Sequence, residues 1–281
     1  SISDNARVAA PAGSVRAFDA RTGAPKWDFD PIPRTESSPV REDWQGSGTP
    51  TEGHANVWAP MSVDEARGLV FLPTTSPSPD FYGGLRPGDN RHANSVVALD
   101  AETGRVEWAF QTVHHDVWDY DVPAQPGLYS VWKDGRTHDV VAQVTKTGLL
   151  FVLDRDTGEP FLPIEERPVP RGNVEGEVLS PTQPFPVATP PIVPNTIDPA
   201  NAFGITWFDK RECRKLLESS RAHGLYTPPS EEGTILLPFT GGGANWGGAA
   251  FDPARNLLVV NMSNLAHHIQ LFRADDLETM R

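Results

Sequence analysis

Short apolar runs that end at an Asp and resume after a Gly recur along the chain. Residues 15–27 (VRAFDARTGAPKW) match residues 96–108 (VVALDAETGRVEW), and a third copy spans 151–161 (FVLDRDTGEPF). In each copy an apolar strand runs into an Asp that starts a turn, a Gly takes the positive-φ position, and an aromatic residue follows on the returning strand. Each copy therefore predicts a β-hairpin, and hairpins repeated around an axis are typical of β-propeller blades.

A second repeat alternates with the first. Residues 58–72 (WAPMSVDEARGLVFL) align without gaps to residues 246–260 (WGGAAFDPARNLLVV), and both contain Asp-x-x-Arg before an apolar run. This pattern predicts an inner strand, a turn and a partner strand. Trp58 and Trp246 stand where the two inner strands are expected to begin.

Between these repeats lie polar or proline-rich stretches. Residues 30–55 and 73–93 are rich in Pro, Gly, Ser, Thr and Asn and are predicted to be long connections. Residues 164–200 are rich in Pro and predict an irregular excursion over the surface; a linker between two domains is the competing interpretation. One short helix is predicted over 208–223, with Gly224 as its C-cap and Asn201 or Asp198 leading into it.

Composition supports an all-β chain and excludes several function classes. Its 281 residues include 28 Pro, 24 Gly and 8 Trp, which suits short strands joined by tight turns. The net charge of −13 argues against nucleic acid as a partner. Cys213 is the only cysteine, so an internal disulfide and a zinc ribbon are both excluded.

Ionisable and aromatic side chains are concentrated at residues 114–121, His-His-Asp-Val-Trp-Asp-Tyr-Asp. One interpretation is structural, with Asp side chains capping turns and Trp118 in the core. Another is a transition-metal site built from His114, His115 and Asp116. Adjacent histidines on an extended chain point to opposite faces, which counts against joint ligation. The density of ionisable groups beside a Pro-x-x-Pro exit favours a functional site.

Five segments together resemble the pyrroloquinoline quinone (PQQ) dependent dehydrogenases, and most closely the glucose dehydrogenase branch. They are QTVHHDVWDYDVPAQP (111–126), KTGLLFVLDR (146–155), SPTQPF (180–185), YTPPSE (226–231) and NWGG (245–248). The resemblance implies a quinoprotein β-propeller, which has eight blades in the family. The hairpins present account for about half of the blades, so residues 1–281 are expected to be part of a single propeller domain and a fragment of a longer protein.

The resemblance also implies roles for particular residues. Asp119 is expected to be the general base that takes a hydroxyl proton while hydride moves to the quinone. Lys146 is expected to hydrogen-bond the quinone oxygens and to act in catalysis with Asp119. Ca²⁺ or Mg²⁺ is expected as a Lewis acid. The expected PQQ-binding residues are Trp58, Lys146, Asn245 and Trp246, and the expected metal ligands are Asp4, Asn5 and Asp119.

By the same resemblance, the substrate is an aldose, a polyol or another alcohol, and electrons pass to ubiquinone or a cytochrome. A periplasmic location is implied, with a possible membrane anchor outside this chain. The alternative is a non-catalytic propeller that binds other proteins, because fold does not fix function. Loss of Asp119, Lys146 or Trp58 would favour that alternative, and all three are present.

Overall fold

Strands dominate the computed structural model, which describes residues 10–35, 37–45 and 53–273. Within these ranges the only α-helix is α2 (Trp207–Ser219), and two short 3-10 helices, η1 (Arg41–Asp43) and η2 (Pro199–Asn201), accompany it. The prediction of an all-β chain with one short helix is confirmed. The described helices include none with the length and apolar character needed to cross a membrane.

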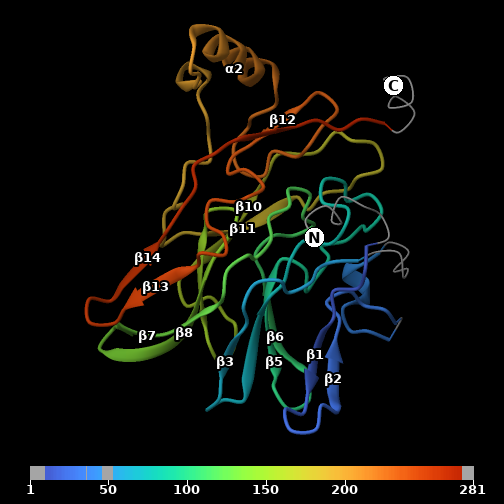
Figure 1. Ribbon diagram of the computed structural model, residues 1–281, viewed down its shortest axis with the longest axis vertical. Coiled ribbons are helices and arrows are strands. Elements are labelled where there is room, and N and C mark those ends of the chain that lie inside the picture. Colours follow the sequence, from blue (N-terminus) through green and yellow to red (C-terminus); the bar gives the residue numbers. More distant parts are fainter. Residues whose placement is uncertain (1–9, 36, 46–52, 274–281) are drawn as a thin grey trace.

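The strands form separate antiparallel sheets, and most of these join strands that are consecutive in the chain (Figure 1). One sheet is a complete four-stranded meander, β3-β4-β5-β6, and the next has the order β7-β8-β9. Pairs β1-β2 and β13-β14 flank them, and β3 contacts β7 while β7 contacts β13. The bounds are β1 Val15–Phe18, β2 Pro25–Phe29, β3 Ser62–Asp64, β4 Leu69–Pro73, β5 Ser95–Asp100, β6 Val106–Gln111, β7 Gly127–Lys133, β8 Arg136–Val144, β9 Leu150–Asp154, β13 Ala249–Asp252 and β14 Leu257–Val260.

The sheets pack face to face because their central strands are apolar on both sides. In β5, Val96 and Ala98 join a cluster that includes Val141 of the next sheet. Their neighbours Val97 and Leu99 point the other way, as the two-residue period of a strand requires. These two join a cluster with residues of the β1-β2 hairpin. The core is therefore a series of layers between blades.

The predicted hairpin turns share one geometry. Asp19, Asp100 and Asp154 each accept hydrogen bonds at Oδ1 from the backbone N–H groups two and three residues later, at 2.8–3.1 Å. Four residues after each Asp, a Gly has a φ of 72–73°. That left-handed conformation favours glycine. The first two turns join paired strands, whereas the third continues into a single bridge between Leu153 and Pro160.

Tryptophans connect successive blades. The Trp27 indole donates to the carbonyl of Ala101 at 3.0 Å, and Trp108 donates to that of Arg155 at 3.2 Å. Each acceptor lies in the turn of the next hairpin, so each indole covers the turn of its neighbour. The third copy carries Phe161 in place of Trp, and its ring has no N–H to donate.

Helix α2 begins at a different cap from the one expected. Thr206 and Asp209 form a capping box, in which each side chain hydrogen-bonds to the other's backbone N–H. Asp198 instead caps η2 by accepting from Ala200. The prediction that Asp198 or Asn201 leads into the helix is therefore wrong.

The helix also ends earlier than predicted. Ser220 is its C-cap, so the predicted extension to His223 with Gly224 as C-cap is wrong. Arg221 instead forms a parallel bridge with Thr234. Pairing with another segment takes residue 221 out of helical conformation before the glycine is reached.

The proline-rich segment 164–200 is more regular than predicted. Strands β10 (Ile164–Pro168) and β11 (Thr182–Pro186) pair antiparallel within it. Their prolines are tolerated because the pair forms its own two-stranded sheet with open edges. A second small pair joins β12 (Thr234–Leu236) to β15 (His267–Ile269).

Two glycines with the same backbone conformation separate the effect of the tryptophan contact from backbone strain. Gly23 and Gly158 both have φ near +72°, but a Cβ on Gly158 would lie 2.4 Å from the Trp108 ring, whereas one on Gly23 meets nothing within 4 Å. We expect Gly23→Ala to lower the unfolding free energy by about 1–2 kcal/mol. Gly158→Ala should lower the unfolding free energy by about 1–3 kcal/mol more than Gly23→Ala does, because the new Cβ would also clash with the Trp108 ring. Urea unfolding measures both; equal losses would contradict an inter-blade role for Trp108.

Candidate active site

One pocket gathers the sequence-predicted residues that the structure describes. It has a volume of about 600 Å³, within the usual range for small-molecule sites. Trp58, Asp119, Lys146, Asn245 and Trp246 all line it, although the first and last are 188 positions apart. Its other lining residues are His54, Asn56, Asp121, Phe239, Thr240 and Gly241.

Lys146 joins two carboxylates at this pocket. Its Nζ lies 3.1 Å from Asp119 Oδ1 and 2.8 Å from Asp121 Oδ2, and it also donates to the carbonyl of Asp119 at 2.9 Å. All three side chains are almost fully buried. A buried ammonium is tolerated only with such partners, because its desolvation would otherwise be costly.

Asp121 is the more firmly held of the two carboxylates. Besides Lys146, it accepts from the backbone N–H of Ser76 at 2.7 Å and from the Trp58 indole at 3.3 Å. Asp121 therefore fixes both Lys146 and Trp58 at the pocket wall.

The loop that carries Asp119 is organised by a buried carboxylate. Asp116 accepts hydrogen bonds from the backbone N–H groups of Trp118 and Tyr120, from Asn94 and from the Ser76 hydroxyl. Trp118 and Tyr120 are both buried and fasten the loop to other segments by donating to the carbonyls of Thr227 and Pro238. With the loop closed around Asp116, Asp119 takes a φ of 58°. Such a conformation is uncommon for a residue other than glycine and often marks functional positions.

Burial and neighbouring charges shift the pKa values of the ionisable groups at the pocket. Burial, followed by the negative charge of Asp121, raises the pKa of Asp119 well above its ordinary value. Burial alone would lower the pKa of Lys146, but the carboxylates of Asp121 and Asp119 outweigh burial and raise it. Lys146 therefore supplies the positive charge of the cluster, and Asp119 binds a proton more readily than an exposed aspartate does.

The glycine-rich segment 241–243 packs against the backbone of Lys146. Gly243 N–H donates to the Lys146 carbonyl at 2.7 Å, and a Cβ on Gly242 would lie 2.6 Å from the Lys146 Cα. In the same segment, the Asn245 side chain donates to the Gly241 carbonyl and accepts from the Trp246 N–H. Asn245 lines the pocket, as predicted, while its amide holds the loop that presents Trp246.

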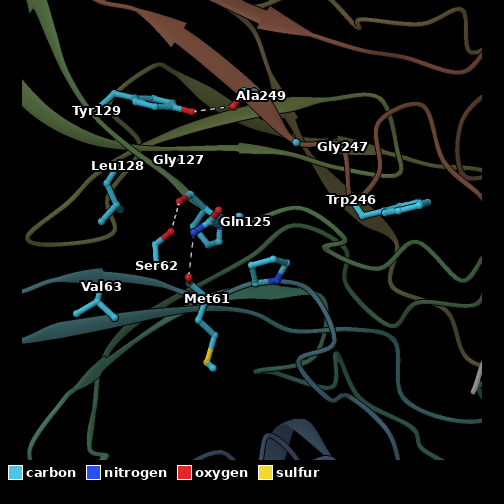
Figure 2. A pocket seen from close by; sticks show the side chains of 13 residues that line it. Met61, Ser62, Val63, Gln125, Gly127, Leu128, Tyr129, Trp246, Gly247 and Ala249 are labelled. Atoms are coloured by element: carbon cyan, nitrogen blue, oxygen red, sulfur yellow. Dashed lines mark hydrogen bonds between the residues drawn. The ribbon is translucent and has the colours of Figure 1, made fainter.

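Trp246 also borders a second pocket, of about 400 Å³, between the innermost strands (Figure 2). There Ser62 donates to the Pro126 carbonyl and the Tyr129 hydroxyl to that of Ala249. The first bond connects β3 to the residue before β7, and the second connects β7 to β13. The second pocket thus follows the line where three blades meet.

The two histidines of the loop do not form a shared metal site. The ring of His114 contacts Gln111 and Glu166, whereas His115 donates from Nδ1 to the carbonyl of Gly88 at 2.6 Å. Burial, followed by the charge of Arg86, lowers the pKa of His115 to about 4, so its ring is neutral. The rings face different surroundings, which argues against the transition-metal interpretation.

The predicted metal ligands are only partly covered by the structure. Asp4 and Asn5 lie outside the described residues, and Asp119 is in the pocket beside Lys146. Within residues 10–35, 37–45 and 53–273, no group of three His, Cys, Asp or Glu side chains is arranged to hold a metal ion.

The whole chain, residues 1–281, matches the model of the PQQ glucose/ethanol/alcohol dehydrogenase β-propeller domain. The chain belongs to this family. The resemblance seen in the sequence and the prediction of a quinoprotein β-propeller are thereby confirmed.

Related proteins of this PQQ family are considerably longer. The chain is 39% identical over 263 residues to quinoprotein glucose dehydrogenase of Escherichia coli, covering 93% of this chain and 32% of that protein. It is 40% identical over 276 residues to quinate/shikimate dehydrogenase (quinone) of Acinetobacter baylyi, covering 97% and 33%. The chain thus spans about a third of the length of these relatives.

A solved structure supports the fold independently. Quinohemoprotein alcohol dehydrogenase from Pseudomonas putida HK5 superposes with a TM-score of 0.65 at 20% identity, over 96% of this chain and 35% of that one. At that identity the likeness shows the fold alone. The partial coverage of that structure fits a propeller in which this chain forms part of the ring.

Several pocket residues carry no sequence signal of their own. His54, Asn56 and Phe239 come from connections without a repeat, and only folding brings them to the pocket. Asp80 was not predicted either. Its side chain is buried, and its Oδ1 has no hydrogen-bond partner among the described residues. Its sequence context, Pro-Ser-Pro-Asp, reads as an ordinary turn.

Asp80 should make folding stability depend on pH. Burial, followed by the charges of Asp121 and Asp116, raises its pKa to about 8. Between about pH 4 and pH 8 the folded state therefore keeps a proton that the unfolded state releases, and stability falls as pH rises. Relative to wild type, Asp80→Asn should remove a slope of up to about 1.4 kcal/mol per pH unit. Urea unfolding from pH 5 to pH 8 measures the slope.

The control is Asp134→Asn, because the Asp134 side chain is 79% exposed and should leave the slope unchanged. An Asp80→Asn protein with the wild-type slope would show that Asp80 is ionised in the folded state.

Proposed function

We propose that this protein is a PQQ-dependent oxidoreductase that oxidises the hydroxyl group of an aldose, a polyol or another alcohol. The observation that carries the proposal is the Asp119–Lys146–Asp121 cluster at a pocket flanked by two indoles. The names of relatives point to glucose, quinate or shikimate, and glycerol as family substrates. A propeller that only binds proteins has no need for a buried lysine between two carboxylates at a pocket.

The pocket suits a flat anionic cofactor. Trp58 is 46% exposed and Trp246 is 77% exposed, so both indoles offer faces against which a planar ring can stack. Lys146 contributes a fixed positive charge at the pocket wall. When bound, PQQ would accept the hydride of the alcohol, which carries the two electrons of the oxidation. Trp58, Trp246, Asn245 and Lys146 are the residues proposed to hold it.

Asp119 is proposed as the general base. Its carboxyl lines the pocket, and burial lets it retain a proton taken from a substrate hydroxyl. Lys146, 3.1 Å from Oδ1, favours the ionised form that must be present before the proton arrives. Asp121 keeps Lys146 in place by a second ion pair. The two carboxylates thus have different tasks.

A divalent cation is proposed beside Asp119. Asp4, Asn5 and Asp119 would offer carboxylate and amide oxygens, the donors preferred by Ca²⁺ and Mg²⁺. A cation bound there would act as a Lewis acid on a carbonyl oxygen. Equilibrium dialysis with each ion identifies the preferred metal.

The remaining assignments follow from the family. We propose that residues 1–281 are part of one propeller domain, which the inter-blade contacts of Trp27 and Trp108 support. A quinone or a cytochrome is proposed as electron acceptor, and the name of one relative, quinate/shikimate dehydrogenase (quinone), supports the quinone. A periplasmic location is proposed with it; cell fractionation tests the location.

Removing the proposed base should slow turnover strongly. We expect Asp119→Asn to lower kcat by about 10²–10⁴-fold, the usual contribution of a general base. The assay is reduction of a redox dye by sugar or alcohol after addition of PQQ and Ca²⁺. Asp252→Asn, at an exposed turn, is the control. An Asp119→Asn protein with wild-type turnover would contradict the assignment.

Removing the indole of Trp58 should weaken PQQ binding. Stacking on an aromatic ring contributes about 0.5–1.5 kcal/mol beyond area burial, so Trp58→Ala should raise the Kd by about 3- to 10-fold or more. Quenching of protein fluorescence on PQQ titration measures the Kd. Trp132→Ala is matched to it, since Trp132 is exposed on β7 away from the pocket. Equal Kd values for the two variants would argue against stacking.

A further inference from the structure

Helix α2 stands at one end of the long axis of the molecule, apart from the blades (Figure 1). One side of it is anchored: Leu217 is buried and packs with Ala202 and Ile235, and the partly buried Cys213 joins them. The opposite side faces away from this cluster. A helix held in this way presents its outer face as a ridge.

The ridge carries an unusual density of exposed apolar side chains. Phe203, Ile205, Trp207 and Phe208 are 80%, 90%, 65% and 71% exposed, and they fall within six consecutive residues. The Trp207 and Phe208 rings contact each other edge to face, 5.2 Å between centroids. Single exposed hydrophobic residues are normal, but a contiguous group of this kind marks an interaction surface.

Basic side chains follow directly along the helix. Four of the 24 Lys and Arg residues lie in these 13 residues, although the chain as a whole has a net charge of −13. Of the acidic residues there, Asp209 belongs to the capping box and Glu212 pairs with Lys215. Together with Trp207 and Glu218, the basic side chains line a hollow of about 540 Å³; they are Lys210, Arg211, Arg214 and Lys215.

The spacing places both kinds of side chain on one face. Trp207, Arg211 and Arg214 follow at i, i+4 and i+7, so they share a stripe along the helix. The Arg211 guanidinium lies 5.5 Å from the centroid of the Trp207 ring. The aromatic end and the basic end can therefore meet one flat surface together.

We propose that this ridge, residues 203–215, docks on the surface of an anionic phospholipid bilayer. Tryptophan and phenylalanine are suited to the boundary between headgroups and acyl chains, and Lys and Arg to headgroup phosphates. The charge of the ridge is opposite to that of the bilayer, whereas the rest of the acidic chain is repelled by it. A ridge also fits a flat bilayer better than it fits a groove.

The test is flotation of the purified protein with phospholipid vesicles. The protein should bind vesicles containing about one quarter phosphatidylglycerol and bind phosphatidylcholine vesicles more weakly. The double variant W207S/F208S should bind about tenfold less well, because it removes two inserting side chains. The matched control W132S replaces a tryptophan that is 64% exposed elsewhere and should bind like wild type.

Hydrogen exchange provides a second readout that reports the site of contact. Amides of residues 203–212 should be protected on addition of the anionic vesicles, and about 0.5 M salt should reverse this protection. Equal binding by W207S/F208S and wild type would overturn the proposal. Unprotected amides at 203–212 would do the same, as would binding of the ridge to another protein without any binding to vesicles.

Discussion

The buried ion cluster of Lys146 with Asp119 and Asp121 is the constraint on which the site depends. One ammonium balances two carboxylates at 3.1 and 2.8 Å, and none of them has much access to water. Removing one partner from a buried pair leaves an uncompensated charge and is costly. The surrounding loops must therefore hold these three side chains together. Asp116 on one side and the glycines at 242 and 243 on the other do so.

The residues of this cluster come from segments that connect different strands, so the site depends on how the blades pack. Lys146 follows β8, the two carboxylates lie in the connection between β6 and β7, and Trp58 precedes β3. Asn245 and Trp246 precede β13, so the pocket needs three blades in a fixed relation. That relation depends on apolar layers between sheets and on indoles that cover the turn of the next hairpin. The site and the packing of the blades are therefore expected to fail together.

Much of this was predictable from the sequence because it is encoded in repeated local patterns. The Asp-to-Gly turns and the inner strands after Trp58 and Trp246 follow from spacing alone. The resemblance then identified five residues that line one pocket. Asp80, Asp121 and His54 were not assigned to the site, because their importance comes from contacts between segments distant in sequence. The start of helix α2 was predicted to within one residue, but its N-cap and its C-terminal end were not, because a capping box and a strand bridge set them rather than periodicity.

In the proposed PQQ site, the cluster of Lys146 and two carboxylates forms one wall. An experimental structure of the protein with saturating PQQ is the decisive test. We expect a planar tricyclic ligand in the pocket with Trp58 and Trp246 beside it, and with a quinone oxygen within hydrogen-bonding distance of Lys146 Nζ. A ligand bound elsewhere on the chain, or a pocket that stays empty at saturation, would contradict it.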